Sequence, residues 1–167
     1  MTDKAIKIVE AHDDKTIDAI TSATSTFENY VKDLKRESGA GKLVLFGAYD
    51  GISYVGRCVL KLVPDEEKVR QLVPGQPVLV ALEVVKDARG KGIGTALCTA
   101  VLQKAKALGY EKISLGVEED NVLARNLYEK IGFTYAGTTY EACWDEPDGT
   151  DTMKRVCVEA VLMVKVL

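Results

Sequence analysis

The sequence lacks the patterns that mark several common classes of enzyme. It has a single histidine, His12, and no Gly-x-Ser-x-Gly turn, which argues against a Ser-His-Asp or Cys-His mechanism. Its four cysteines lie far apart and form no Cys-x-x-Cys pair, so the sequence predicts neither a zinc site nor a thioredoxin-like redox motif, and no metal is expected. We expect free thiols, mostly in the core, at Cys58, Cys98, Cys143 and Cys157.

Strong charge and long apolar runs are also missing. The net charge is −3, so no overall electrostatic attraction to nucleic acid or to an anionic membrane is expected. No apolar run approaches the ~20 residues that a membrane span needs. Residues 1–14 lack the apolar core of a signal peptide. These absences predict a cytoplasmic protein with neither nucleic acid nor membrane as a partner.

What the sequence does contain is the composition of an ordinary globular domain. Apolar residues make up 47% and charged residues 28% of the chain, which suits one domain over residues 1–167. Hydrophobic periodicity predicts the order β, α, β, β, β, α, β, α, β, β, an α/β arrangement. The expected strands cover 5–11, 42–49, 52–63, 78–85, 112–117, 133–140 and 153–167.

Three helices are expected between these strands. The first carries Ile17, Ile20, Phe27, Val31 and Leu34 on one face. The second begins after a glycine-rich stretch, and a short third helix follows a polar residue that can cap it. Residues 64–77 are expected to be a connector, and residues 141–151 a polar loop.

The glycine-rich stretch lies where a strand becomes a helix, and it reads Arg-Gly-Lys-Gly-Ile-Gly over residues 89–94. Glycines at such a junction let backbone N–H groups crowd around an anion, and the helix N-terminus adds partial positive charge. A Walker loop is excluded because Lys91 is followed by glycine. The dinucleotide fingerprint matches only in part, since Leu97 occupies its third glycine position, although Glu118 could stand in for its ribose-binding acid.

A third phosphate-binding pattern fits better. Arg89-x-x-Gly92-x-Gly94 resembles the Arg/Gln-x-x-Gly-x-Gly/Ala signature of the GCN5-related N-acetyltransferase (GNAT) superfamily. Residues 117–133 resemble the family's second conserved block, and residues 159–167 its final strand. The resemblance implies the GNAT fold, with a central mixed and mostly antiparallel sheet of about seven strands that is splayed between strands 4 and 5 and flanked by helices.

The resemblance also implies that acetyl-CoA is the co-substrate. The backbone of the glycine loop would hold the pyrophosphate, the strand before it would contact the pantetheine arm, and an N–H there, that of Val84, would polarise the thioester carbonyl. Two of the expected cofactor-binding side chains also have simpler explanations: Lys91 could be solvated, and Asn121 could serve as a helix cap without contacting the cofactor. The expected cofactor-binding residues are Leu82, Val84, Arg89, Gly90, Lys91, Gly92, Ile93, Gly94, Thr95 and Asn121.

Catalysis requires a proton donor for the CoA thiolate and a base for the acceptor amine. Tyr128 matches the family tyrosine near the CoA sulfur, though it could instead be a core aromatic. Two branches of the family carry a base glutamate at positions that here are Gly116 and Val78. We therefore assign the base to Glu83; Glu118, or an ordered water held by a more distant carboxylate or a backbone carbonyl, remains an alternative.

The resemblance predicts an N-acetyltransferase that moves an acetyl group from acetyl-CoA to a primary amine of a small molecule or peptide, by direct attack in a ternary complex. The alternatives are a non-catalytic acyl-CoA-binding or sensor domain of the same fold and a nucleotide-dependent oxidoreductase. The family also allows a homodimer. The acceptor would lie near the loop 141–151, whose five carboxylates surround Trp144 and could either attract a cationic amine or simply be solvated.

Overall fold

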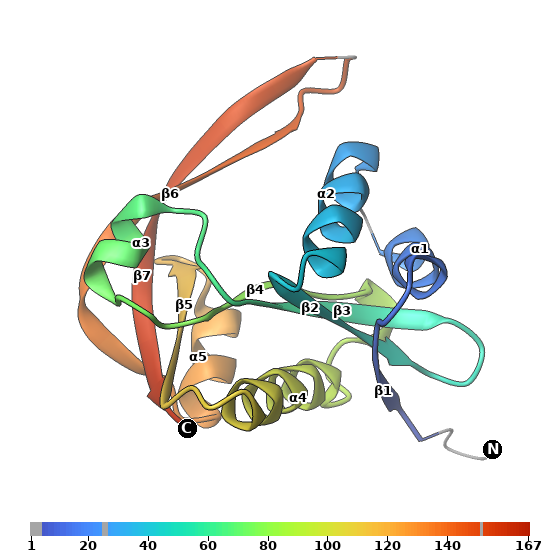
Figure 1. The fold of residues 1–167 in the computed structure, drawn as a ribbon, viewed down its shortest axis with the longest axis horizontal. Helices are drawn as coiled ribbons and strands as arrows, with labels where there is room; N and C mark the ends of the chain where they lie inside the picture. Colours follow the sequence, from blue (N-terminus) through green and yellow to red (C-terminus); the bar gives the residue numbers. More distant parts are fainter. Residues whose placement is uncertain (1–4, 25–26, 151) are drawn as a thin grey trace.

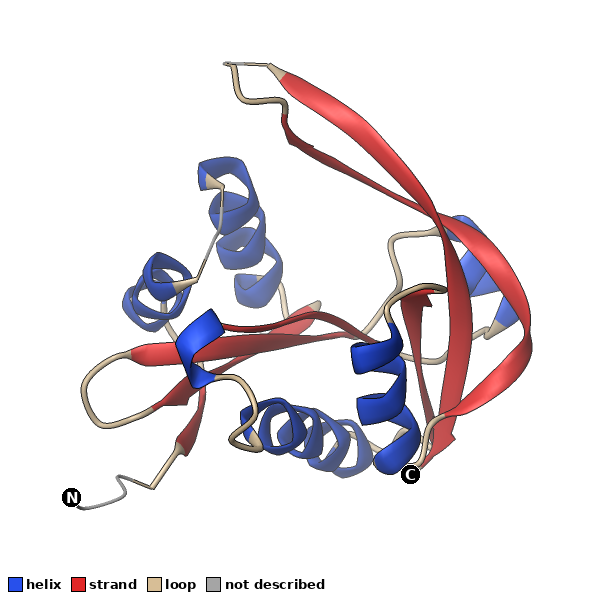
Figure 2. Cartoon of the chain, turned by 180° about the vertical axis from the view of Figure 1, so that it is seen from behind, coloured by secondary structure: helices blue, strands red, loops and turns tan. Residues whose placement is uncertain are grey.

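The computed structural model describes residues 5–24, 27–150 and 152–167. Within them a seven-stranded sheet runs in the order β1-β2-β3-β4-β5-β7-β6. Figure 1 shows α1 and α2 on one face of the sheet and α4 on the other, and Figure 2 shows α5 beside α4. The expected GNAT fold is confirmed, including the parallel pair β4-β5 in an otherwise antiparallel sheet.

The elements follow the chain in this order: β1 Lys7–Glu10, α1 Asp14–Ala23, α2 Glu28–Gly39, β2 Leu43–Tyr49, β3 Tyr54–Lys61, α3 Glu67–Leu72, β4 Val78–Val84, the 3₁₀ turn η1 Lys86–Ala88, α4 Ile93–Ala107, β5 Lys112–Glu118, α5 Val122–Lys130, β6 Thr134–Pro147 and β7 Met153–Val166. No helix among the described residues has both the length and the apolar character needed to cross a membrane.

The single first helix expected from the sequence is wrong, because two helices occupy that region. Asp13 caps α1 by accepting the N–H of Thr16 at 2.7 Å, and α1 ends at Ala23. The hydroxyls of Thr21 and Thr24 donate to backbone carbonyls within α1, an alternative bonding pattern that weakens helix continuation. Phe27, expected on the apolar face, instead stands at the N-cap of α2 and is 44% exposed.

The two segments expected to lack regular structure are also partly ordered. The connector contains α3, whose Val69 is buried together with Val73 against Leu162 of β7. The polar loop is shorter than expected, since β6 pairs with β7 as far as Pro147 opposite Met153. The two strands form a long arm that extends past the rest of the sheet (Figure 1), and its exposed, polar composition is what made it resemble a loop.

The cysteines divide into two groups. Cys58 and Cys98 are free and buried, as expected. Cys143 and Cys157 are joined in a disulfide, so the expectation of free thiols there is wrong. They face one another in the β6–β7 ladder with Cα atoms 4.2 Å apart, a closeness that the strand register creates. Glu141 lies beside them, but the disulfide removes both thiolates that a metal ion would need, so these three residues do not support a metal site.

Candidate active site

The sheet opens between β4 and β5. The two strands share one register pair, Val78 with Ser114, reinforced by the Ser114 N–H donating to the carbonyl of Pro77 at 3.0 Å. Beyond this point the strands diverge, and each leaves an edge without a ladder partner. The splay lies near the middle of the sheet and opens toward the loop that precedes α4 (Figure 2).

A β-bulge in β4 shapes one side of this opening. Arg57 pairs with Glu83 while Val59 pairs with Val80, so β4 has one more residue than β3 over the same stretch. Ala81 lies in this bulge with φ +54°, the one positive φ among the described residues other than glycine. A left-handed alanine is strained, and such strain persists where the surrounding structure enforces it, often near functional sites.

We expect glycine at position 81 to be tolerated better than at an ordinary strand position. Glycine relieves the left-handed strain, worth about 1–2 kcal/mol, which offsets its own entropic cost of about 0.5–1 kcal/mol. Ala81→Gly should therefore leave the free energy of unfolding unchanged or raised by up to about 1 kcal/mol, whereas Ala48→Gly in the extended strand β2 should lower it. Urea denaturation measures both. A loss in Ala81→Gly equal to that in Ala48→Gly would show that the bulge carries no strain.

The end of β4 presents backbone groups to the opening. The N–H of Val85 donates to the carbonyl of Val55 at 2.9 Å, which makes these two residues a hydrogen-bonded pair of the antiparallel ladder. Since such pairs alternate, the N–H and carbonyl of Val84 point away from β3. The Val84 carbonyl accepts the Nε of Arg89 at 2.9 Å, and its N–H is placed to donate to a group in the splay.

The glycine loop ends at the N-terminus of α4, where backbone N–H groups lack helical partners. Gly90 and Gly92 have φ of +75° and +78°, and Gly92 is the N-cap of α4. The first hydrogen bond of the helix runs from Ala96 to Gly92 at 3.0 Å, so the preceding N–H groups of Ile93 and Thr95 are left for a ligand. A Cβ on Gly90 or Gly92 would meet nothing within 4 Å, which shows that the space in front of the loop is open.

The basic side chains of the loop make contacts within it. Arg89 donates to the end of β4 through its Nε, and the Nζ of Lys91 donates to the carbonyl of Asp87 at 3.2 Å. Gly94 has a different role, because a Cβ there would lie 3.2 Å from Leu127 Cδ2. The absence of a Cβ on Gly94 lets α4 approach α5 closely, and this close approach positions α5, which carries Tyr128.

Asn121 is the N-cap of α5, and its Oδ1 accepts the N–H of Ala124 at 3.2 Å. The capping alternative is therefore what the structure shows for the side-chain oxygen. Among the described residues the structure gives its amide NH2 no partner, so a contact with a cofactor stays compatible with the cap.

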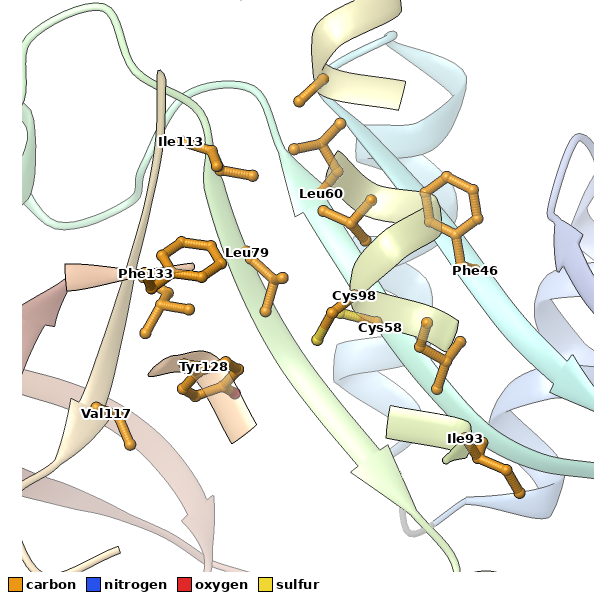
Figure 3. Close-up of a cluster of buried hydrophobic side chains, with 14 of the residues drawn as sticks. Phe46, Cys58, Leu60, Leu79, Ile93, Cys98, Ile113, Val117, Tyr128 and Phe133 are labelled. Atoms are coloured by element: carbon orange, nitrogen blue, oxygen red, sulfur yellow. The ribbon is translucent and has the colours of Figure 1, made fainter. Parts of the chain in front are cut away.

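Tyr128 is buried near the opening. Its ring packs edge-on against Phe133 with centroids 6.0 Å apart, and Figure 3 shows it between β4 and β5. Burial raises the pKa of the phenol, and the nearby Cys98 and Cys58 act in the same direction, so the hydroxyl keeps its proton at neutral pH. The hydroxyl has no hydrogen-bond partner within the described part of the chain, and Tyr128 lines a cavity of about 310 Å³.

Glu83 lies apart from that cavity. Its Oε2 accepts Nη2 of Arg57 at 3.0 Å and Nε of the same guanidinium at 3.3 Å. Arg57 is buried and stacks over the Tyr30 ring at 5.2 Å. The structure therefore does not bring the two predicted catalytic residues to one cavity, and it gives Glu83 a cationic partner.

The cavity contains two groups that the sequence did not reveal. Tyr140 from β6 and Glu66, which precedes α3, line it together with Tyr128. Trp144, expected near the acceptor, lines it too. Glu66 lies 62 residues before Tyr128 and 74 before Tyr140 in the sequence, and only the placement of α3 and β6 brings these side chains together. The acidic residues expected to attract an amine are partly paired instead, Asp145 with Arg155 at 3.3 Å.

Comparisons with known proteins agree with this geometry. Residues 10–133 match the sequence model of the Acetyltransferase (GNAT) family. A mycothiol acetyltransferase from Geodermatophilus obscurus is 36% identical over 89 residues, which covers 53% of this chain and 28% of that protein. The chain spans about a quarter to about half the length of the curated relatives it matches.

Solved structures share the fold at low sequence identity. An N-acetyltransferase from Staphylococcus aureus superposes with a TM-score of 0.71 at 16% identity, covering 97% of this chain and 98% of that one. A putative acetyltransferase from Salmonella typhimurium, solved with its cofactor acetyl-CoA, gives 0.67 at 17% identity and covers 98% and 94%. The splayed α/β fold with its glycine loop defines an acyltransferase scaffold. The chain belongs to the GNAT acetyltransferase family.

Proposed function

We propose that this protein is an N-acetyltransferase that transfers the acetyl group of acetyl-CoA to a primary amine of a small molecule or peptide. The observation that supports this most is the splay between β4 and β5, which has an anion-binding helix terminus on one side and a cavity lined by Tyr128 on the other. A cofactor with a pyrophosphate at one end and a thioester at the other fits these two features.

In this proposal the backbone of residues 89–95 binds the pyrophosphate, with Arg89 and Lys91 supplying nearby positive charge. The pantetheine arm lies along the free edge of β4 beside Leu82 and Val84. The outward N–H of Val84 donates to the thioester oxygen and stabilises the negative charge that develops there during attack. Asn121 contributes its amide NH2 from the start of α5.

The acceptor amine approaches from the cavity and forms the new C–N bond as the C–S bond breaks. Tyr128 donates its proton to the departing thiolate, and its raised pKa means that this proton is present at neutral pH until the thiolate forms. Glu83 is the base predicted from the sequence. Its ion pair with Arg57 limits its freedom to take up a proton.

The test has two parts. Acetyl-CoA should raise the melting temperature of the protein, and a panel of primary amines should then produce free CoA thiol with at least one member. Stabilisation without thiol release from any amine would favour a non-catalytic acyl-CoA-binding domain, an alternative supported by the absence of a carboxylate at Gly116 and Val78. If acetyl-CoA gives no stabilisation and no amine gives thiol release, the proposed function is contradicted.

A further inference from the structure

Tyr140 of β6 fills a place that a side chain on β5 would otherwise occupy. A Cβ built on Gly116 would lie 1.9 Å from the Tyr140 hydroxyl oxygen and 2.8 Å from its Cζ. Only a glycine at position 116 allows this approach. The phenol therefore reaches β5 at the edge of the splay, within the cavity that Tyr128 lines from α5.

Glu66 is the acidic neighbour of the Tyr140 phenol. It precedes α3, is partly buried, and lines the same cavity. Burial raises the pKa of its carboxyl, while the backbone N–H of Cys143 and the Tyr140 hydroxyl act in the opposite direction. The same contact contributes to raising the pKa of Tyr140, after burial. The carboxylate and the phenol thus form an interacting pair at one wall of the cavity.

The other charged groups near this wall are engaged with one another. Lys61 forms ion pairs with Asp65 and, at 3.0 Å, with Glu37. Lys61 and Asp65 both line the cavity beside Glu66. The Lys61 charge is shared between two other carboxylates, and Glu66 forms no ion pair with any of the described residues. The groups that favour its ionised form are therefore the N–H of Cys143 and the hydroxyl of Tyr140.

We propose that Glu66 is the general base for the acceptor amine and that Tyr140 holds the Glu66 carboxylate in place. The pair then performs the role of the carboxylate that β5 lacks at Gly116. The inference rests on the proposed acetyltransferase function. Glu66 is the catalytic residue of the pair, and Tyr140 is a positioning residue that orients the carboxylate toward the cavity.

The proton balance of the reaction is complete with these groups. The ammonium form of the acceptor gives one proton to the Glu66 carboxylate, and the neutral nitrogen attacks the thioester carbon. When the C–S bond breaks, the thiolate takes the proton of Tyr128. The second proton lost by the nitrogen restores that phenol, and Glu66 releases its own proton to solvent. The products are the amide, CoA thiol and one free proton.

The test compares matched carboxamide variants in the full chain. Glu66→Gln should lower kcat with the best amine of the panel about ten-fold, remove the acidic limb of the kcat profile against pH, and leave acetyl-CoA stabilisation unchanged. Glu67→Gln is the control, because Glu67 is the adjacent exposed carboxylate and lines no part of this cavity. Tyr140→Phe should move the acidic limb to higher pH, because the hydroxyl that it removes stabilises the ionised Glu66 carboxylate and lowers its pKa.

Each of four results would overturn the inference. Equal profiles for Glu66→Gln and Glu67→Gln in an active enzyme would remove Glu66 from the reaction and leave the proposed function intact. Loss of the acidic limb in Glu83→Gln alone would assign the base to Glu83. No thiol release by the unaltered protein would contradict the proposed function and the inference with it. Carbon-13 NMR titration of the Glu66 carboxyl adds a readout free of turnover: its pKa should rise in Tyr140→Phe, and an unchanged value would show that no pair exists.

Discussion

Gly92→Glu is expected to abolish the stabilisation of the protein by acetyl-CoA. The substitution brings a carboxylate to the N-terminus of α4, where the proposal puts the cofactor's pyrophosphate, so like charges meet at the one place where backbone donors converge. The fold should survive, because a Cβ on Gly92 meets nothing within 4 Å. The backbone cost of a non-glycine residue at φ +78° is about 1–2 kcal/mol.

The measurement is a thermal-shift titration with acetyl-CoA. A ligand at 100 times its Kd stabilises a folded protein by about 2.7 kcal/mol, which is a readily measured shift. Gly75→Glu is the matched control, since Gly75 has φ +72° and equally open surroundings but lies between α3 and β4. It should suffer the same loss of stability and keep the full response. A full response in Gly92→Glu would place the cofactor away from this loop.

Tyr128→Phe is expected to reduce turnover by at least about ten-fold while acetyl-CoA affinity stays within a few-fold. The substitution keeps the ring that packs on Phe133 and removes only the hydroxyl. Complete loss of general acid catalysis typically costs about 100- to 10,000-fold, and the smaller bound allows for water to replace the phenol. The buried, protonated hydroxyl that lines the cavity is the group whose loss should matter.

Steady-state release of CoA thiol gives kcat for both proteins, and the thermal-shift titration gives the affinity. Tyr135→Phe supplies the control for the chemical change, because Tyr135 lies on β6 with 58% of its surface exposed. Turnover in Tyr128→Phe that matches this control would assign Tyr128 to core packing. A fall in acetyl-CoA affinity equal to the fall in kcat would instead indicate a role in cofactor binding.

The backbone structure around the glycine loop could be predicted because its signals are local. The glycines before α4, the strand that leads into them and the helix that follows are contiguous in the sequence, and the positive φ of Gly90 and Gly92 is what such a turn requires. The same holds for Asn121 as a helix cap. The splay itself followed from the resemblance to the family, because no property of residues 78–84 alone prevents them from pairing along their full length.

Of the cavity proposed for the acceptor, the sequence indicated Trp144 and its loop, but not Glu66 or Tyr140, because their placement depends on contacts between distant segments. Glu66 lies in a stretch rich in proline and charge, and only the packing of α3 on β7 turns it toward Tyr140. The pairing of Cys143 with Cys157 likewise follows from the β6–β7 register. Glu83 was on the expected strand, but its partner Arg57 comes from β3, and a single-strand pattern does not show what faces a side chain across a sheet.

The divergence of β4 from β5 has a consequence for handling the protein. Beyond Val78 and Ser114 each strand has a row of backbone donors and acceptors in the middle of the sheet with no ladder across the gap. These are internal edges, and unprotected edges are where sheets from separate molecules join and aggregate. A ligand lying along them acts as a temporary strand that covers both. Concentrated samples should therefore be purified and stored with CoA present, which protects the two halves of the sheet from pairing with those of another molecule.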